Sequence, residues 1–152
     1  QYNIDIMKVI LMLAIHELGE TIIGDLTQFE ISKEEKEKIE HAAVHKILGS
    51  LLDGKLIEEL FLEFDSHRTK ESLFAYQCDK LECDIQMKLY DQEGCFDLSN
   101  QPNNPIINNP SVKKVLDSEK SISNAWIEFD RSKYEDDKNF IEIIEYLKEN
   151  EI

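Results

Sequence analysis

The chain has 152 residues, 41% of them hydrophobic, and a formal net charge of −15 at pH 7. This length and composition predict one globular domain with a single apolar core. The acidic charge argues against nucleic acid polymers as partners, because proteins that bind them neutralise phosphates with Lys and Arg. A small phosphate ester bound through a metal is compatible with this charge.

The cysteines and the apolar N-terminal run favour a cytoplasmic protein that does not enter a membrane. The three cysteines, Cys78, Cys83 and Cys95, lack CxxC spacing and are odd in number, so they predict neither a disulfide framework nor a zinc knuckle. Such thiols suit a reducing cytoplasm. The apolar run over residues 4–15 is interrupted by charged residues and is too short to span a bilayer.

The first predicted helices lie in the N-terminal third of the chain. Residues 4–15 are apolar almost all round a helix, which predicts a central helix covered by others. Ser32 followed by Glu35 forms a capping box that predicts a second helix starting near Lys33. Gly49 fits the C-terminal cap of that helix.

The rest of the chain is also predicted to be helical, and the fold class is therefore all-α. Thr69 can cap a long helix, and residues 93–110 carry Gly, Pro and Asn residues that predict an irregular loop. No run alternates as a half-buried strand does. The remaining predicted helices cover residues 57–64, 70–92, 111–125 and 137–150.

The first apolar helix leads directly into a group of ionisable residues. His16 and Glu17 are followed by Glu20, which shares a helix face with His16 if the helix continues through both. Gly24 lets the backbone bend, so that Asp25 can return to the same side. A partly buried cluster of this kind is tolerated mainly when a cation compensates its charge or when its pKa values serve acid–base chemistry. The stretch therefore predicts an active site.

The long predicted helix offers a third candidate ligand. Asp79, Glu82 and Gln86 fall on one stripe beside the apolar stripe, which places Asp79 at the margin of the core. Together with His16 and Glu17, Asp79 gives a nitrogen and oxygen ligand set. Such a set suits a divalent metal such as Mn, Co, Fe, Ni or Zn, with Mg as a further candidate, better than an all-oxygen calcium site.

These motifs carry a resemblance to a known family. His16-Glu17 followed by Glu20 and Asp25, and then the helix beginning Asp79-Lys80-Leu81-Glu82, resembles the HD-domain metal-dependent phosphohydrolases, and most closely their 5'-deoxynucleotidase branch. The resemblance covers roughly residues 7–92, and residues 126–134 are also similar to that branch. It implies an all-α HD-domain bundle that hydrolyses (deoxy)nucleoside 5'-monophosphates to nucleoside and phosphate.

The resemblance also implies roles for single residues. His16, Glu17 and Asp79 would be metal ligands, while Glu20 and Asp25 would act on the substrate and the attacking water. Glu17 stands where the family usually has Asp, and the family's first His ligand and its phosphate-binding Arg have no counterpart before His16. We therefore expect a helical segment preceding residue 1 that packs beside residues 4–16 and presents the missing His.

Other functions remain open at this point. The chain could be an HD phosphohydrolase acting on cyclic nucleotides or nucleoside triphosphates, or a non-catalytic helical module with a degenerate metal site. Asp79 could instead form an ion pair with Lys80 or Lys88. The apolar excess on several helices would also suit a homodimer.

Three further features have a structural interpretation. His41 and His45 have the spacing of a zinc-binding helix but lack the Glu that follows the first His in such motifs, so they predict exposed helix residues. The charged run over residues 34–40 predicts a solvated helix face. Trp126 predicts core packing or a dimer contact rather than a nucleobase pocket.

Overall fold

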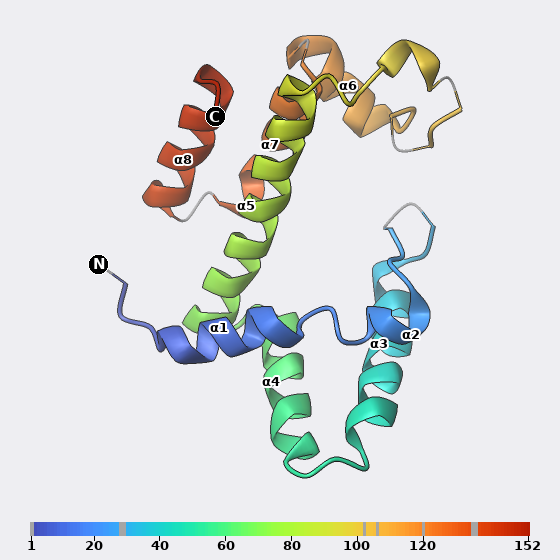
Figure 1. Ribbon diagram of the computed structural model, residues 1–152, viewed down its shortest axis with the longest axis vertical. Coiled ribbons are helices and arrows are strands. Elements are labelled where there is room, and N and C mark those ends of the chain that lie inside the picture. The colour runs from blue at the N-terminus through green and yellow to red at the C-terminus, as the bar shows by residue number, and fades with distance from the viewer. Residues whose placement is uncertain (1, 28–29, 102, 106, 120, 135–136) are drawn as a thin grey trace. The chain divides into compact units, whose positions relative to one another are not determined.

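The computed structural model describes residues 2–27, 30–101, 103–105, 107–119, 121–134 and 137–152, and the only regular secondary structure in these ranges is helical (Figure 1). The predicted all-α fold class is thereby confirmed. None of the helices in these ranges is both long and apolar enough to cross a membrane. The chain divides into two compact units, residues 1–76 and 77–152, and helix α5 (Lys70–Gln92) belongs to both.

The first unit contains α1 (Ile6–Ile15), α2 (Glu20–Ile23), α3 (Lys33–Leu48), α4 (Gly54–Ser66) and the first turns of α5. Helices α3 and α4 are neighbours in sequence and pack against each other (Figure 1). Helix α1 packs on α4, and the short α2 packs on α3. The stretch that carries His16 therefore lies between two helices, α1 and α2, that are held by different partners.

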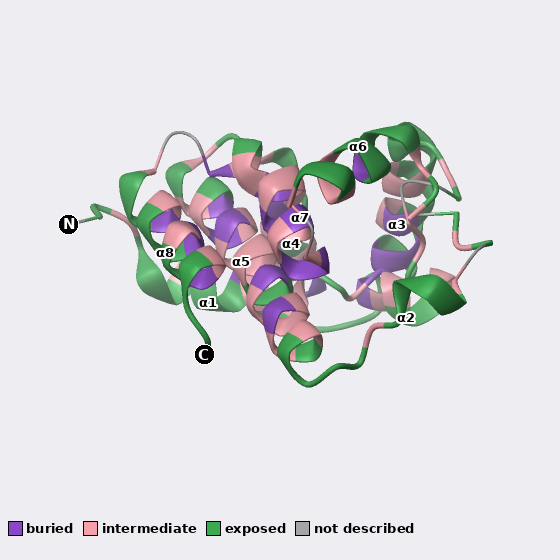
Figure 2. Ribbon diagram, turned by 90° about the horizontal axis from the view of Figure 1, so that it is seen from above, coloured by how far each residue is buried: buried purple, intermediate pink, exposed green. Residues whose placement is uncertain are grey.

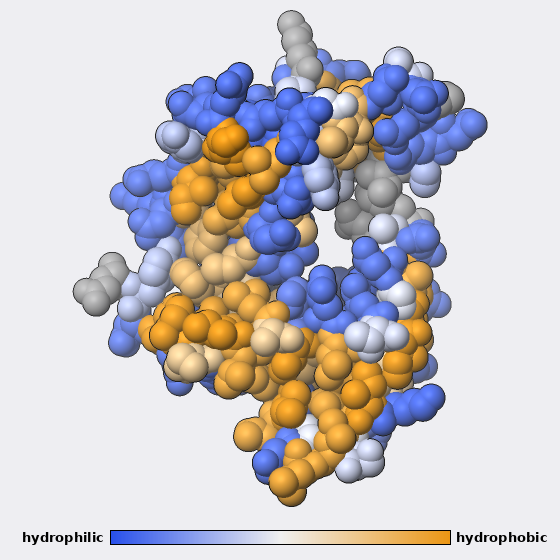
Figure 3. Space-filling view, viewed as in Figure 1, coloured by the Kyte–Doolittle hydropathy of each residue, from blue (hydrophilic) through white to orange (hydrophobic). Residues whose placement is uncertain are grey.

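Helix α1 is less buried than its sequence predicts. Only Val9 and Met12 are buried, in a cluster with Phe64 and Ala75. The opposite face is exposed and forms part of the hydrophobic surface of this unit in Figure 3. Its exposed side chains are Ile6, Met7, Ile10 and Leu11. The prediction of a helix buried on all sides is wrong, because α1 packs against its neighbours through one face only.

Local capping chemistry explains where several helices begin. The Asp5 carboxylate accepts hydrogen bonds from the backbone amides of Met7 and Lys8, so α1 starts at residue 6. Ser32 caps α3 by accepting from the amide of Glu35, which is the first bond of the predicted capping box, and its hydroxyl also donates to the Glu35 carboxylate. Thr69 accepts from the amide of Ser72 at the start of α5. These starts agree with the predicted ones to within two residues.

The second unit contains the remainder of α5 together with α6 (Pro110–Glu119), α7 (Ile122–Asp130), α8 (Lys138–Glu149) and the short 3-10 helices η1 (Leu98–Asn100) and η2 (Arg131–Lys133). The predicted helix over 111–125 is instead two helices, because Ser121 adopts an extended conformation and caps α7. Residue 120 lies outside the described residues, as do two positions of the predicted loop, 102 and 106.

Helices α7 and α8 pack in this second unit through apolar stripes. Phe140, Ile144 and Leu147 are buried on one side of α8, whereas Ile143 is exposed; buried and exposed turns alternate along α8 in Figure 2. Trp126 lies 6.4 Å from Phe129, ring centroid to ring centroid, and lines a small apolar cavity between α6 and α7. Trp126 is half-buried there, and its predicted role in core packing or a dimer contact stays a prediction.

Candidate active site

The candidate stretch begins where α1 ends. Residues 16–19 form tight turns in which Leu18 N–H donates to Ile15 O and Glu20 N–H donates to Glu17 O, both at 3.0 Å. These bonds span three residues rather than the four of an α-helix, so the helix does not continue through His16 and Glu20. The predicted common helix face of these two residues is wrong. Instead, His16 ends α1, Glu20 begins α2, and a turn separates the two residues.

The ring of His16 is oriented by the helix that precedes it. Its Nδ1 lies 2.8 Å from the carbonyl oxygen of Leu13, and its ring lies 5.2 Å from that of Phe64. A carbonyl oxygen can only accept, so Nδ1 is the donor of this bond, and in a neutral imidazole Nε2 then carries the lone pair. Metal-binding histidines commonly have this arrangement, in which a backbone carbonyl fixes the tautomer.

Glu17 lies next to the ligand-capable nitrogen of His16. Its Oε1 is 3.9 Å from His16 Nε2, and its side chain is 73% exposed while that of His16 is 20% exposed. One imidazole nitrogen and one carboxylate oxygen therefore face the same small region, and these donor types fit a divalent transition metal. Within the part of the chain that the structure describes, no three His, Cys, Asp or Glu side chains form a group that could hold a metal ion.

Glu20 makes a specific contact with α3. Its Oε1 lies 2.9 Å from the Nζ of Lys36, and both side chains are less than one third exposed. Asp25 follows Gly24, whose φ of 78° gives the predicted bend in the backbone. Asp25 itself is exposed. The predicted roles of Glu20 and Asp25 in catalysis stay predictions.

Glu40 is buried, although the charged run over residues 34–40 predicts a solvated helix face; that prediction is wrong for Glu40. Glu40 is only 9% exposed and packs against Gly19. Burial raises the pKa of its carboxyl group, and nearby Lys36 opposes this shift. Helical spacing gave a signal for this burial, since Glu40 lies three and four residues before the buried Ala43 and Val44.

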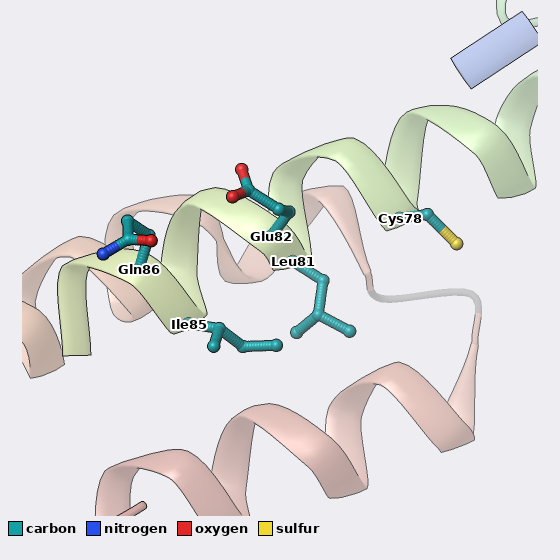
Figure 4. Close-up of a pocket in the computed structure, with 5 residues that line it drawn as sticks. All are labelled: Cys78, Leu81, Glu82, Ile85 and Gln86. Atoms are coloured by element: carbon teal, nitrogen blue, oxygen red, sulfur yellow. The ribbon is translucent and has the colours of Figure 1, made fainter. Parts of the chain in front are cut away.

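Asp79 belongs to the second unit, where its carboxylate lies 2.8 Å from Lys80 Nζ and is 17% exposed. This position at the margin of the core agrees with the predicted one, and the ion pair is one of the alternatives named above. An open depression about 270 Å³ in volume lies along the same part of α5 (Figure 4). Its lining residues are Cys78, Leu81, Glu82, Ile85 and Gln86. The metal-ligand role of Asp79 stays a prediction.

The two histidines of α3 pair with carboxylates of α4. His41 Nε2 lies 2.6 Å from Asp65 Oδ2, and His45 Nδ1 lies 2.9 Å from Glu58 Oε1. Each imidazole therefore has a partner on the neighbouring helix. The two rings serve the contact between α3 and α4. His45 is exposed, as predicted, whereas His41 is half-buried.

The chain belongs to the HD domain family, whose model matches residues 1–111 and so includes the His16–Asp25 stretch and Asp79. Among curated proteins, it is 38% identical over 94 residues to 5'-deoxynucleotidase HDDC2 of Dictyostelium discoideum, covering 60% of this chain and 50% of that protein. It is 38% identical over 86 residues to 5'-deoxynucleotidase hdd1 of Schizosaccharomyces pombe, covering 52% and 43% respectively. The human 5'-deoxynucleotidase HDDC2 is 31% identical over 91 residues, covering 58% and 42%.

The matched region spans about half the length of these curated relatives. No solved structure matches the chain.

Proposed function

We propose that the protein is a metal-dependent phosphomonoesterase that hydrolyses deoxynucleoside 5'-monophosphates to nucleoside and phosphate. The observation that carries the proposal is the pairing of His16 and Glu17. The bond between His16 Nδ1 and the Leu13 carbonyl orients the ring so that Nε2 lies 3.9 Å from Glu17 Oε1. Membership of the HD domain family and the names of the curated relatives support the choice of reaction.

In this proposal, His16, Glu17 and Asp79 hold the metal. His16 supplies Nε2 because Nδ1 is occupied by the Leu13 carbonyl, and Glu17 supplies Oε1. A divalent metal contributes positive charge that polarises the phosphoryl oxygens and lowers the pKa of water. The identity of the metal is left among Mn, Co, Fe, Ni, Zn and Mg, since this donor set discriminates weakly between them.

The two remaining carboxylates are assigned to proton transfer. Glu20 begins α2 and is held by Lys36, so its carboxylate has a defined direction in which to orient or deprotonate the attacking water. Asp25 follows the bend at Gly24 and is exposed, which suits a group that protonates the leaving 5'-oxygen or holds the sugar.

The substrate assignment is tested with a panel of nucleotides. The protein with its native N-terminus is incubated with Mn or Co and with deoxynucleoside monophosphates, ribonucleoside monophosphates, triphosphates and cyclic nucleotides, and products are separated chromatographically. We expect nucleoside and phosphate from the deoxynucleoside monophosphates. Turnover of triphosphates or cyclic nucleotides, with monophosphates untouched, would overturn the substrate class.

A further inference from the structure

The start of α2 is held by two side chains of α3 that lie one helical turn apart. Lys36 and Glu40 are separated by four residues and so project from the same face of α3. They contact consecutive residues of the candidate site, since Lys36 pairs with Glu20 and Glu40 packs on Gly19. These two neighbouring contacts fix the start of α2 against α3.

The contact at Gly19 is close enough to define the position of the backbone. A Cβ atom at residue 19 would lie 2.3 Å from Glu40 Cγ and 3.3 Å from the backbone oxygen of Glu40. With the Glu40 side chain in this position, the backbone at Gly19 lies too close to α3 to leave room for a Cβ atom. Gly19 has a φ of −61°, so close approach, and not an unusual backbone conformation, is what requires glycine here.

Helix α2 depends on such contacts because it is short. It has four residues, far fewer than an isolated helix needs to be stable in water. Its amides are bonded locally, with Ile22 N–H donating to Gly19 O and Gly24 N–H donating to Glu20 O. The direction of the Glu20 side chain is thus set by packing on α3 and by the ion pair with Lys36.

The charges around Lys36 are consistent with this arrangement. Glu40 is buried, and its carboxyl group is influenced by Lys36, which favours its ionised form, and by Glu20 and Asp65, which disfavour it. Lys36 is therefore a cation that pairs with Glu20, a residue of the candidate site, and also acts electrostatically on Glu40. A side chain in this position can fix one carboxylate while limiting its repulsion by the other.

We infer that Lys36 is a positioning residue for Glu20, and that Glu40 fixes the distance between α2 and α3 through Gly19. The inference rests on the proposed function, because the role of Glu20 in turnover belongs to that proposal. Lys36 acts on the reaction only through Glu20 and does not touch the substrate in this account.

The test is a double-mutant cycle on the whole protein loaded with Mn and assayed on a deoxynucleoside monophosphate. Lys36→Met should lower kcat by about 10- to 100-fold, the scale of loss from a misplaced catalytic group, while KM changes by less than about threefold. Lys36→Arg should restore most of kcat, because the guanidinium can still pair with Glu20. On a Glu20→Gln background, Lys36→Met should cause no further loss.

Lys33→Met is the matched control. Lys33 lies on the same helix and pairs with Glu37 at 3.4 Å, but its side chain is 75% exposed and its partner lies on α3 itself rather than on α2. Its removal should leave kcat unchanged. Equal losses of kcat from Lys36→Met in the presence and absence of Glu20, or a loss confined to KM, would overturn the inference.

The failure of the proposed function can be told apart from failure of this inference. A wild-type protein that hydrolyses no nucleotide overturns the proposed function. The thermal unfolding midpoints of the wild type, Lys36→Met, Glu20→Gln and the double variant then test the contact alone. Non-additive shifts for Lys36→Met and Glu20→Gln support the positioning contact, and additive shifts overturn it.

Discussion

Tyr134 donates a hydrogen bond of 2.6 Å from its phenol to Asp84 Oδ2, and both side chains are completely buried in the second unit. The other carboxyl oxygen, Oδ1, has no hydrogen-bond partner among the described residues. Burial raises the pKa of Asp84 to about 7, although the bond from Tyr134 and the charges of Lys133 and Lys80 act in the opposite direction. Asp130 adds to the increase.

This carboxyl group predicts that the protein becomes less stable as the pH rises from about 4 to about 7. In the unfolded chain Asp84 ionises near pH 3.8, whereas in the folded protein it keeps its proton until about pH 7. The folded state therefore binds more protons in this interval, and the free energy of unfolding falls by at most about 1.4 kcal/mol per pH unit. Above the folded pKa this contribution stays constant.

Asp84→Asn isolates that contribution, since Asn has nearly the same shape, accepts from Tyr134 and does not ionise. We expect the variant to unfold at a higher temperature than the wild type at pH 8, with the difference shrinking toward pH 4. Differential scanning calorimetry of both proteins over this range measures it. A difference that is independent of pH would show that Asp84 is ionised throughout.

Gly19→Ala tests the close approach of α2 to α3. The new methyl group would meet Glu40 Cγ at 2.3 Å, and we expect a loss of roughly 1–3 kcal/mol in the free energy of unfolding, as for other overpacked sites. Combining it with Glu40→Ala should recover much of the loss, because the clashing side chain is then absent. Urea unfolding of the three variants measures the coupling. Additive losses would mean that Glu40 is not what excludes a side chain at residue 19.

Asp91 joins α5 to the start of α7, and we expect this contact to contribute strongly to the stability of the fold. Its Oδ2 accepts from the hydroxyls of Ser121 and Ser123 at 2.8 and 2.7 Å and from the amide of Ser123 at 3.1 Å. Burial raises the pKa of Asp91, but the hydrogen bonds from Ser123 and Ser121 lower it by more, so the pKa lies below its usual value. Asp91→Ala should cost about 1–3 kcal/mol of stability, because it leaves three donors without their charged acceptor.

Asp97→Ala is the control for that variant. Asp97 also accepts from a serine hydroxyl and amide, those of Ser99, but it is exposed and its partner is two residues away. Asp97 is the N-cap of η1, so we expect a loss of about 0.5–1 kcal/mol, the lower end for a cap because the site is exposed. Equal losses for Asp91→Ala and Asp97→Ala in chemical denaturation would contradict the role given to Asp91.

The sequence predicts the helices of this protein best where their ends depend on local chemistry. The starts of α3 and α5 follow from Ser32 and Thr69, because a cap and the amides it binds are only three residues apart. The break between α6 and α7 was missed, since it depends on the extended conformation of Ser121 and its bond to the distant Asp91.

The arrangement of the candidate site could not be predicted from the sequence, and the roles of its residues stay predictions. The spacing from His16 to Asp25 indicates candidate donors, whereas the turn that separates His16 from Glu20 depends on how α2 packs on α3. The Lys36–Glu20 pair joins residues sixteen positions apart, and no spacing rule predicts such a contact. The exposed face of α1 was mispredicted for a related reason, because an apolar pattern does not determine which faces find partners.

Substitutions separate metal ligands from catalytic carboxylates in the proposed site. His16→Gln and Asp79→Ala should abolish metal binding together with activity, because each removes a donor atom. Glu20→Ala should leave metal binding intact and lower kcat by about 10² or more, the scale of lost acid–base catalysis. Metal content by mass spectrometry, measured beside kcat, distinguishes the two effects. If Glu20→Ala emptied the site, Glu20 would be a ligand and its assigned role would be wrong.

The most direct test of the account is phosphate release under control of the metal. The protein with its native N-terminus is given a deoxynucleoside 5'-monophosphate, first with Mn, then after chelation, and then after Mn is restored, beside His16→Gln under the same conditions. The account predicts phosphate release that is lost on chelation, recovers with Mn, and is reduced at least about 10²-fold in His16→Gln. Release that persists through chelation, or that is equal in wild type and His16→Gln, would contradict it.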